Sequence, residues 1–301
     1  MKRMLALLAG LVLILAMAAG CSSAPEAASD SAEPSQAADA ASETPAAEDS
    51  AAESPASEES AASDAQGEVL KRIIGNGKLI VLTNAQFPPY EYMGSDGTPV
   101  GVDMDIAQAI ADQIGVELEI TDMEFDSLIP ALVSGKGDIV AAGMTVDEER
   151  KQAVDFSDTY ADAKQMIIVP VEGATVASEE DLAGKTIGVQ LGTTGDLYVS
   201  DNVEGADVKQ YKSALEAALD LKNGRLDAVV IDLLPAENIA ASNEDLVLID
   251  MASTDEQYAI AIEKNNEDLV EIINGVIAQL TEDGTIADST AVHVEASRVS
   301  A

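Results

Sequence analysis

The stretch SGKGDIV at residues 134–140 has a counterpart in NGRLDAVV at residues 223–230. In both, a glycine ends a helical pattern, a basic residue and an aspartate follow, and a buried β-branched strand comes next. The copies stand about ninety residues apart, which indicates two lobes of similar construction. Ligands of open α/β sheets bind beyond the carboxyl ends of the strands, so the residues after these two strands are candidates for a binding site.

Strand and helix patterns alternate over residues 68–301. Isoleucines recur with helical spacing over 106–114, and Leu215 and Leu219 precede an Asn-Gly stop at 223–224. Strands separated by helices predict an α/β fold with mostly parallel sheets. The expected strands cover residues 79–82, 139–140, 166–169, 186–189, 229–231, 246–249 and 258–262.

The residues after the two strands offer groups for an anion and a cation. TVDE at 145–148 fits a capping box, which predicts a helix that begins at Thr145 with free backbone N–H groups. Arg150 follows, and a guanidinium can hold a carboxylate through two parallel hydrogen bonds. GTTG at 192–195 predicts a second helix start, and Asp232 suits a cation.

An anion and a cation at close range describe the α-carboxylate and α-ammonium of a free amino acid. Taken singly, each residue has a plainer interpretation: a capping threonine, a surface arginine, an aspartate that caps the next helix. Their joint placement favours the amino-acid site.

The N-terminus is typical of a secretory signal, with two basic residues before an apolar run over 4–18 that is short for a membrane span. Small residues lead into Cys21, the single cysteine, and resemble a bacterial lipobox, which prefers leucine where Ala18 stands. We expect a signal peptide over 1–20 and a lipid on Cys21 that anchors the chain to the cell membrane. The alternative is an ordinary signal peptide.

The segment after Cys21 is acidic and almost free of large apolar residues up to residue 67, which predicts a disordered, self-repelling tether. The formal net charge of −39 argues against nucleic acid and anionic lipid as partners. An acidic surface also attracts small cations, but solubility is its plainer explanation.

Six short motifs follow one another between residues 87 and 194. Each is weak alone, whereas the ordered set is specific. They are FPPYE at 87–91, GVDMDI at 101–106, IPAL at 129–132, GMT at 143–145 with Arg150, DFSD at 155–158 and QLGTT at 190–194.

Together these motifs resemble the polar amino-acid-binding proteins of ABC transporters, which include the glutamine and histidine receptors, over about residues 76–287. The resemblance implies a type II periplasmic-binding fold, with two α/β lobes joined by two crossing segments. The first lobe would comprise 68–160 plus 257–301, and the second 161–256.

The resemblance also implies roles for single residues. Arg150, Thr145 and the backbone of Gly143 correspond to the grip on the ligand's carboxylate in the first lobe. Thr193 and Thr194 would help from the second lobe.

The resemblance implies that Asp232 binds the ligand's ammonium. It also implies that Phe87 and Phe125 pack against the two faces of the ligand's side chain. Asp103 and Asp105 lie within the family's signature, and we interpret them as helix-start carboxylates. A calcium loop needs further oxygens and a glycine that are missing, so we expect no metal and no cofactor.

The residues expected around the ligand's side chain limit which amino acids the site could bind. Asn84 stands where several relatives carry aspartate, and Gln190 and Ile231 occupy positions that vary with specificity. Two aromatic faces suit a flat or cationic group, and Glu124 could pair with a distal cation or face solvent. This favours arginine, lysine, histidine or glutamine, the basic ones first, and leaves cystine open.

The end of the chain departs from the family pattern, because STAVHV at 289–294 replaces a helix that usually ends in basic and aromatic residues. The pattern therefore gives no support for a last helix. The only histidine, His293, lies in this segment.

A few relatives of this fold are dehydratases, but catalysis would need a tuned acid or base in the cleft, and Glu124 is the only stray candidate. A ligand sensor without transport is a further alternative. We expect a monomeric, extracytoplasmic binding protein, not an enzyme, that delivers a polar L-amino acid to an ABC permease.

Overall fold

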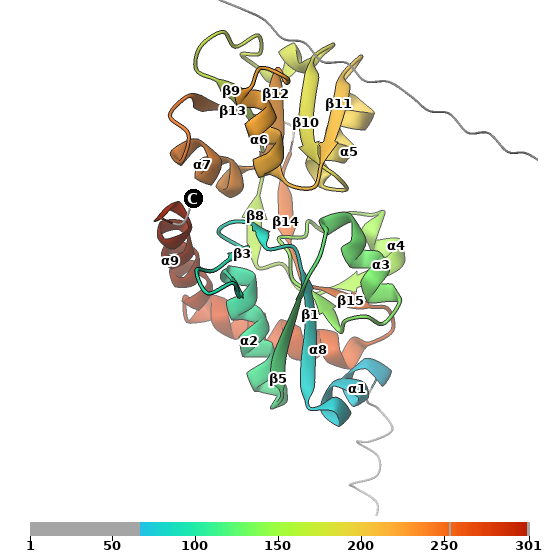
Figure 1. Cartoon of the computed structure of the whole chain (residues 1–301). Coiled ribbons are helices and arrows are strands. Elements are labelled where there is room, and N and C mark those ends of the chain that lie inside the picture. Colours follow the sequence, from blue (N-terminus) through green and yellow to red (C-terminus); the bar gives the residue numbers. More distant parts are fainter. Residues whose placement is uncertain (1–66, 253, 300–301) are drawn as a thin grey trace, which may run out of the picture. The chain divides into compact units, whose positions relative to one another are not determined.

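The computed structural model describes residues 67–252 and 254–299, which form two five-stranded sheets (Figure 1). The expected signal peptide, the lipid on Cys21 and all but the last residue of the tether lie outside the described residues. Within the described part, every helix is too short or too polar to cross a membrane.

The two sheets share one strand order. The first contains β5 (Glu117–Asp122), β1 (Lys78–Thr83), β6 (Ile139–Val140), β15 (Ala261–Glu263) and β7 (Val154–Phe156). The second contains β11 (Asp207–Tyr211), β10 (Thr186–Gln190), β12 (Ala228–Asp232), β9 (Gln165–Pro170) and β13 (Leu246–Asp250).

In each sheet the first three strands pair in parallel, and the fourth runs antiparallel to both of its neighbours. The expectation of mostly parallel sheets is therefore wrong for half of the pairings. The antiparallel strands β9 and β15 each enter their sheet from a segment that crosses between the lobes, not from a helix packed on the sheet. Consecutive parallel strands need a crossover connection, usually a helix packed on the sheet.

The crossing segments contain β8 (Ala161–Ala163) and β14 (Glu256–Tyr258), which pair antiparallel between the two sheets (Figure 1). Six of the seven expected strands lie within observed ones, but the run over 258–262 splits, because Tyr258 ends β14 and Ala261 begins β15. The division into a first lobe (68–160 plus 257–301) and a second lobe (161–256) remains our proposal, and we use these names below.

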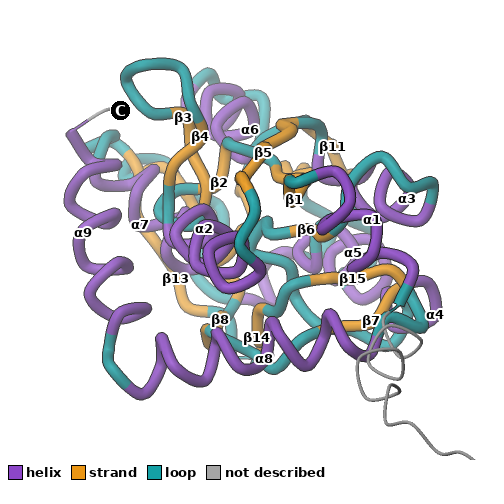
Figure 2. Tube along the Cα trace, turned by 90° about the horizontal axis from the view of Figure 1, so that it is seen from below, coloured by secondary structure: helices purple, strands orange, loops and turns teal. Residues whose placement is uncertain are grey.

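Helices cover both sheets, and α9 lies along α2, α7 and α8 (Figure 2). In the first lobe they are α1 (Glu68–Asn76), α2 (Val102–Ile114), α3 (Leu128–Val133), α4 (Arg150–Ala153), α8 (Glu267–Glu282) and α9 (Thr285–Val299). In the second lobe they are α5 (Thr194–Asn202), α6 (Ala214–Lys222) and α7 (Leu233–Ala241). A small sheet of β2 (Gln86–Phe87), β3 (Glu91–Met93) and β4 (Pro99–Val100) and the 3₁₀ turns η1 (Phe125–Ser127) and η2 (Glu179–Leu182) complete the fold.

The core confirms one helical pattern and corrects another. Ile106 and Ile110 of α2 are fully buried, as their spacing predicts. On α6, by contrast, Leu215 and Leu219 are 44% and 60% exposed, and alanines face the sheet instead. A Cβ added at Gly188 of β10 would lie 3.1 Å from the Ala217 Cβ, so α6 packs too close to the sheet for leucine on that face.

The segment for which the family pattern gave no support is helical, because it forms α9. His293 lies in α9 between the first-lobe side chains Tyr92, with Nδ1 3.0 Å from its hydroxyl, and Asp105, with Nε2 3.1 Å from its Oδ2. Ser297 accepts a buried hydrogen bond of 2.8 Å from Asn238 of α7. The polar tail thus packs through specific hydrogen bonds, where the family pattern has basic and aromatic residues.

Candidate functional site

A small cavity lies where the carboxyl ends of β1, β6, β10 and β12 meet. Its volume is about 10 Å³, room for roughly one water molecule. The lobes are therefore closed on each other, and an amino acid could enter only if they separated. Besides Ala142, the cavity is lined by all ten residues selected from the sequence: Asn84, Phe87, Phe125, Gly143, Thr145, Arg150, Gln190, Thr193, Thr194 and Asp232.

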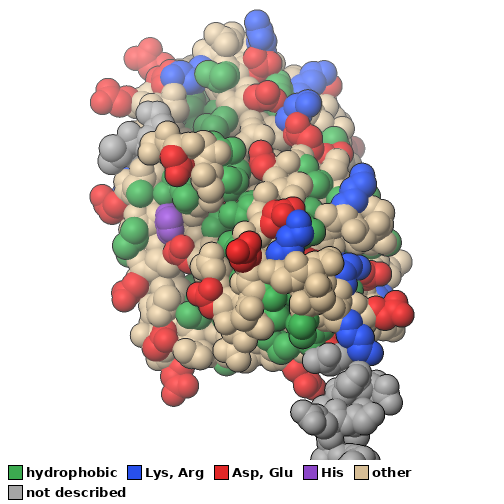
Figure 3. Space-filling model, turned by 60° about the horizontal axis from the view of Figure 1, so that its bottom comes forward, with side chains coloured by type: hydrophobic (Ala, Val, Ile, Leu, Met, Phe, Trp, Pro, Cys, Tyr) green, Lys and Arg blue, Asp and Glu red, His purple; other side chains and the backbone are tan. Residues whose placement is uncertain are grey.

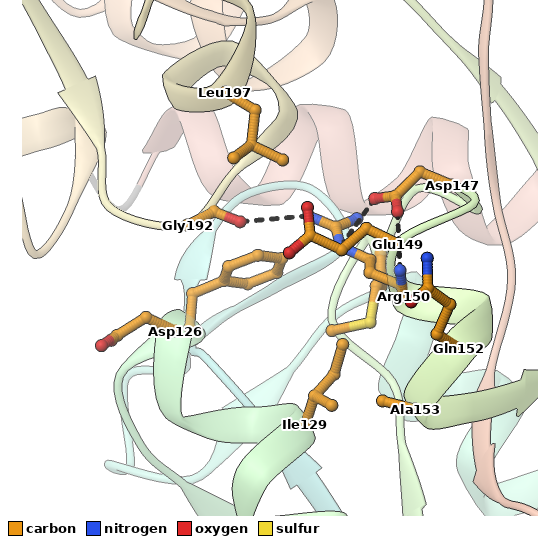
Figure 4. Close-up of a pocket in the computed structure, with 11 residues that line it drawn as sticks. Asp126, Ile129, Asp147, Glu149, Arg150, Gln152, Ala153, Gly192 and Leu197 are labelled. Atoms are coloured by element: carbon orange, nitrogen blue, oxygen red, sulfur yellow. Dashed lines mark hydrogen bonds and ion pairs between the residues drawn. The ribbon is translucent and has the colours of Figure 1, made fainter. Parts of the chain in front are cut away.

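Arg150 lies at the start of α4 with a side chain only 8% exposed, and its guanidinium spans the two lobes (Figure 4). Nη1 donates to the carbonyl oxygen of Thr145 at 2.6 Å, and Nη2 donates to that of Gly192 at 3.1 Å. Nε lies 3.1 Å from Asp147 Oδ2. Since a guanidinium has five N–H groups, one on each Nη is left for a ligand carboxylate.

Two further features surround this guanidinium. Its carbon lies 5.5 Å from the ring centroid of Phe125, so the cation over this ring is the protein's own. Burial lowers the pKa of Arg150, while the negative charges of Asp147 and Asp232 act in the opposite direction. An arginine stays charged under such a shift.

The helix expected to begin at Thr145 begins at Arg150 instead. Thr145 forms an antiparallel bridge with Tyr258 of the second crossing segment, so its backbone is extended and cannot start a helix. Asp147 serves as the cap, because its Oδ1 accepts the backbone N–H of Arg150 at 2.8 Å. The second predicted start is confirmed: α5 begins at Thr194, and Thr193 caps it.

Gly143 differs from its expected role in the carboxylate grip. Its N–H donates to Asp103 at 2.8 Å, so this N–H is not free for a ligand. Its φ of 49° favours glycine, and an added Cβ would lie 2.8 Å from the Phe87 ring. Asp103 also accepts from the Tyr160 hydroxyl at 2.8 Å, and burial raises the pKa of Asp103 to about 6. It is the structural helix-start carboxylate that the sequence predicts.

Asp232 ends β12 and is 4% exposed. It makes no side-chain hydrogen bond to the start of α7, so the plainer role of helix cap is not realised. The Tyr258 hydroxyl donates to its Oδ1 at 2.7 Å. Burial, reinforced by the charge of Glu256, raises the pKa of Asp232 to about 7.

Glu256 is the group that the sequence analysis missed. It lies on β14, and its Oε2 accepts hydrogen bonds of 2.8 Å from the hydroxyls of both Thr145 and Thr194. Gln165 donates to its Oε1 at 3.1 Å. No local motif marks Glu256, because its partners come from distant parts of both lobes.

The residues expected around the ligand's side chain also form contacts between the two lobes. Gln190 donates to Asn84 at 2.9 Å, while its Oε1 is buried and has no partner among the described residues. Glu124 pairs with a cation of the protein itself, because its Oε1 accepts a hydrogen bond of 3.0 Å from Lys212 across the cleft, and its side chain is still 39% exposed. Ile231 is buried in the core and does not line the cavity.

A larger, open cavity of about 510 Å³ adjoins the other side of Arg150. Figure 4 shows Leu197 of the second lobe on one side and Ile129 of the first lobe on the other. Acidic side chains lie on its wall, as they do over much of the surface seen in Figure 3. Within the described residues, no group of three or more His, Cys, Asp or Glu could hold a metal ion.

Comparison with known proteins agrees with this geometry. The sequence profile described as "Bacterial extracellular solute-binding proteins, family 3" matches residues 79–293. The L-cystine-binding protein TcyJ of Escherichia coli K12 is 32% identical over 226 residues, 74% of this chain and 85% of its own.

Two solved structures share the fold. A glycine-to-alanine mutant of arginine-bound ArgBP of T. maritima is 45% identical, with a TM-score of 0.68 over 70% of this chain and 99% of its own. An ancestral amino acid-binding protein, described as a precursor of cyclohexadienyl dehydratase, is 34% identical, with a TM-score of 0.70 over 76% of this chain and 100% of its own. The two lobes and the cleft are those of a type II periplasmic-binding protein.

Proposed function

The chain belongs to family 3 of the bacterial extracellular solute-binding proteins, and we propose that it binds a basic L-amino acid, arginine first, and delivers it to an ABC permease. One observation carries the proposal: Arg150 of the first lobe and Asp232 of the second line the same cavity. An α-carboxylate and an α-ammonium on one carbon atom would satisfy both.

The preference for a basic side chain rests on the acceptors nearby. The buried Oε1 of Gln190 has no partner among the described residues, and an unsatisfied buried acceptor costs about 1–3 kcal/mol. A guanidinium brings only donors, and it can stack on Phe87 or on Phe125 once the lobes open. The likeness to arginine-bound ArgBP supports the same ligand.

Cystine is the second candidate, because the similarity to TcyJ extends over 85% of that protein. Glutamine binding, ligand sensing without transport and a dehydratase activity have no comparable observation in their favour. The dehydratase likeness is to an ancestral precursor of cyclohexadienyl dehydratase that is itself an amino acid-binding protein.

We also propose that the protein works as a monomer outside the cytoplasm, held to the membrane through a lipid on Cys21 after loss of residues 1–20. The acidic segment that follows would then act as a tether. The basis is the arrangement of basic, apolar and small residues before the single cysteine. Two or more acyl chains are needed for a firm anchor.

The ligand can be tested by thermal denaturation of the purified protein with each of the twenty amino acids and cystine. We expect arginine to give the largest increase in Tm and lysine a smaller one. The largest shift with cystine would select the second candidate. Branched aliphatic ligands as the best binders, with no response to basic ones, would contradict the proposed side-chain pocket.

A further inference from the structure

Glu256 connects the two lobes through a carboxylate, as Arg150 does through its guanidinium. It lies on the second crossing segment and contacts a threonine from each lobe through a single oxygen, Oε2. An ionised carboxylate only accepts hydrogen bonds, so the hydroxyl hydrogens of Thr145 and Thr194 both point at Glu256. Neither hydroxyl can then donate to a ligand carboxylate, but both keep a lone pair.

The double contact depends on closure. Thr145 belongs to the first lobe and Thr194 to the second, and the lobes must separate for a ligand to enter the 10 Å³ cavity. One oxygen cannot stay within 2.8 Å of both hydroxyls once the lobes move apart. The contact therefore stabilises the closed form relative to the open one, which is how differential contacts shift such an equilibrium.

We propose that Glu256 is a positioning residue of the amino-acid site, which holds Thr145 and Thr194 in the closed cleft and strengthens the negative field that receives the ligand's ammonium. The inference rests on the proposed function. The carboxylate of Glu256 acts on Asp232, whose pKa its charge helps to raise. Ligand affinity should therefore depend on pH in a way that Glu256 controls.

Other groups also face Asp232 and set the background for this effect. Tyr258 donates a hydrogen bond to it, and the positive charge of Arg150 lies near it. Tyr90 and the fully buried Glu91 interact with it electrostatically from the segment after β1. Of the acidic groups, Glu256 contributes the largest charge effect on Asp232.

The test is the Kd of arginine at pH 8.0 and pH 5.5, measured by isothermal titration calorimetry on the purified protein and on E256Q, E256D and D255N. With an Asp232 pKa of about 7, we expect the Kd of the unaltered protein to be about 30-fold higher at pH 5.5 than at pH 8.0, because the protonated carboxyl cannot bind the ammonium. Glu256→Gln removes the charge but keeps the size. We expect its Kd at pH 8.0 to rise about tenfold and its ratio of the two Kd values to fall below about 10.

The other variants separate charge from contact. Glu256→Asp keeps the charge and shortens the side chain, so affinity should drop while the pH ratio stays near 30. Asp255 is the exposed neighbour of Glu256, and D255N should match the unaltered protein. Circular dichroism shows whether each variant is folded. If E256Q does not fold, the comparison of E256D with the unaltered protein still tests the contact made by Glu256.

Two results would overturn the inference. One is an E256Q protein with unaltered Kd at both pH values. The other is an E256Q protein that binds more weakly with the pH ratio unchanged, which would mean a purely structural role. If the unaltered protein bound no amino acid, the proposed function itself would fail, and this outcome is distinct from both.

Discussion

Replacing Arg150 with alanine should cost more binding energy than any other single change at the cleft. The side chain is 8% exposed, and its guanidinium carries two hydrogen bonds and an ion pair with Asp147. Losing one member of a buried charge pair costs about 2–5 kcal/mol, and each 1.4 kcal/mol is tenfold in Kd. We therefore expect the Kd of arginine to rise about 30- to 4000-fold in Arg150→Ala.

Calorimetry measures the affinity, and circular dichroism shows whether the variant is folded. Arg150→Lys keeps the charge but loses the planar fork, so its Kd should lie between those of the unaltered protein and Arg150→Ala. Arg225 provides a matched control, because it is 68% exposed and pairs with Asp220 at the far end of α6. A folded Arg150→Ala protein with a Kd within about threefold of the unaltered protein would refute the carboxylate assignment.

Three further outcomes are expected. Arginine affinity should fall about tenfold for each pH unit below about 7 and level off above it, because only the ionised Asp232 accepts the ammonium; titrations from pH 5 to 9 that show no slope would contradict this. Small-angle scattering should show a more compact particle with arginine than without, whereas an unchanged profile at saturation would argue against closure on ligand. Phe125→Ala should weaken the binding of arginine more than the binding of alanine, by roughly 0.5–2 kcal/mol in competition calorimetry, because the Phe125 ring is expected to stack on the arginine side chain.

The lipid on Cys21 can be tested separately in cells. Cys21→Ser should move the protein from the membrane fraction to the soluble one, because it removes the thiol that would carry the lipid. Ser22→Ala, next to it, is the control and should stay with the membrane. Equal distribution of all three proteins would rule out lipid anchoring at this position.

The site was largely predictable because its residues follow strands that are recognisable from local sequence. A glycine, an aspartate and a β-branched run mark β6 and β12, and the candidate ligand-binding groups stand at or just past the ends of these strands, as Asp232 does at the end of β12. Three strands of the two five-stranded sheets escaped detection: β5, β7 and β11 alternate charged with apolar residues and lie at the sheet edges. An edge strand buries little apolar surface, so its sequence lacks the continuous apolar run by which a buried strand is recognised.

The sequence by itself indicated the α/β class and the two-lobed organisation, and it selected the residues that we propose for the ligand's carboxylate and ammonium. These inferences rest on short local patterns, some repeated along the chain, in which periodicity and capping act. Only the tertiary structure decided that Thr145 is extended, that the N–H of Gly143 is occupied, and that Glu256 reaches both lobes. Thr145 and Glu256 are 111 residues apart in the chain. Contacts over such separations depend on how the lobes close, and no local pattern encodes that.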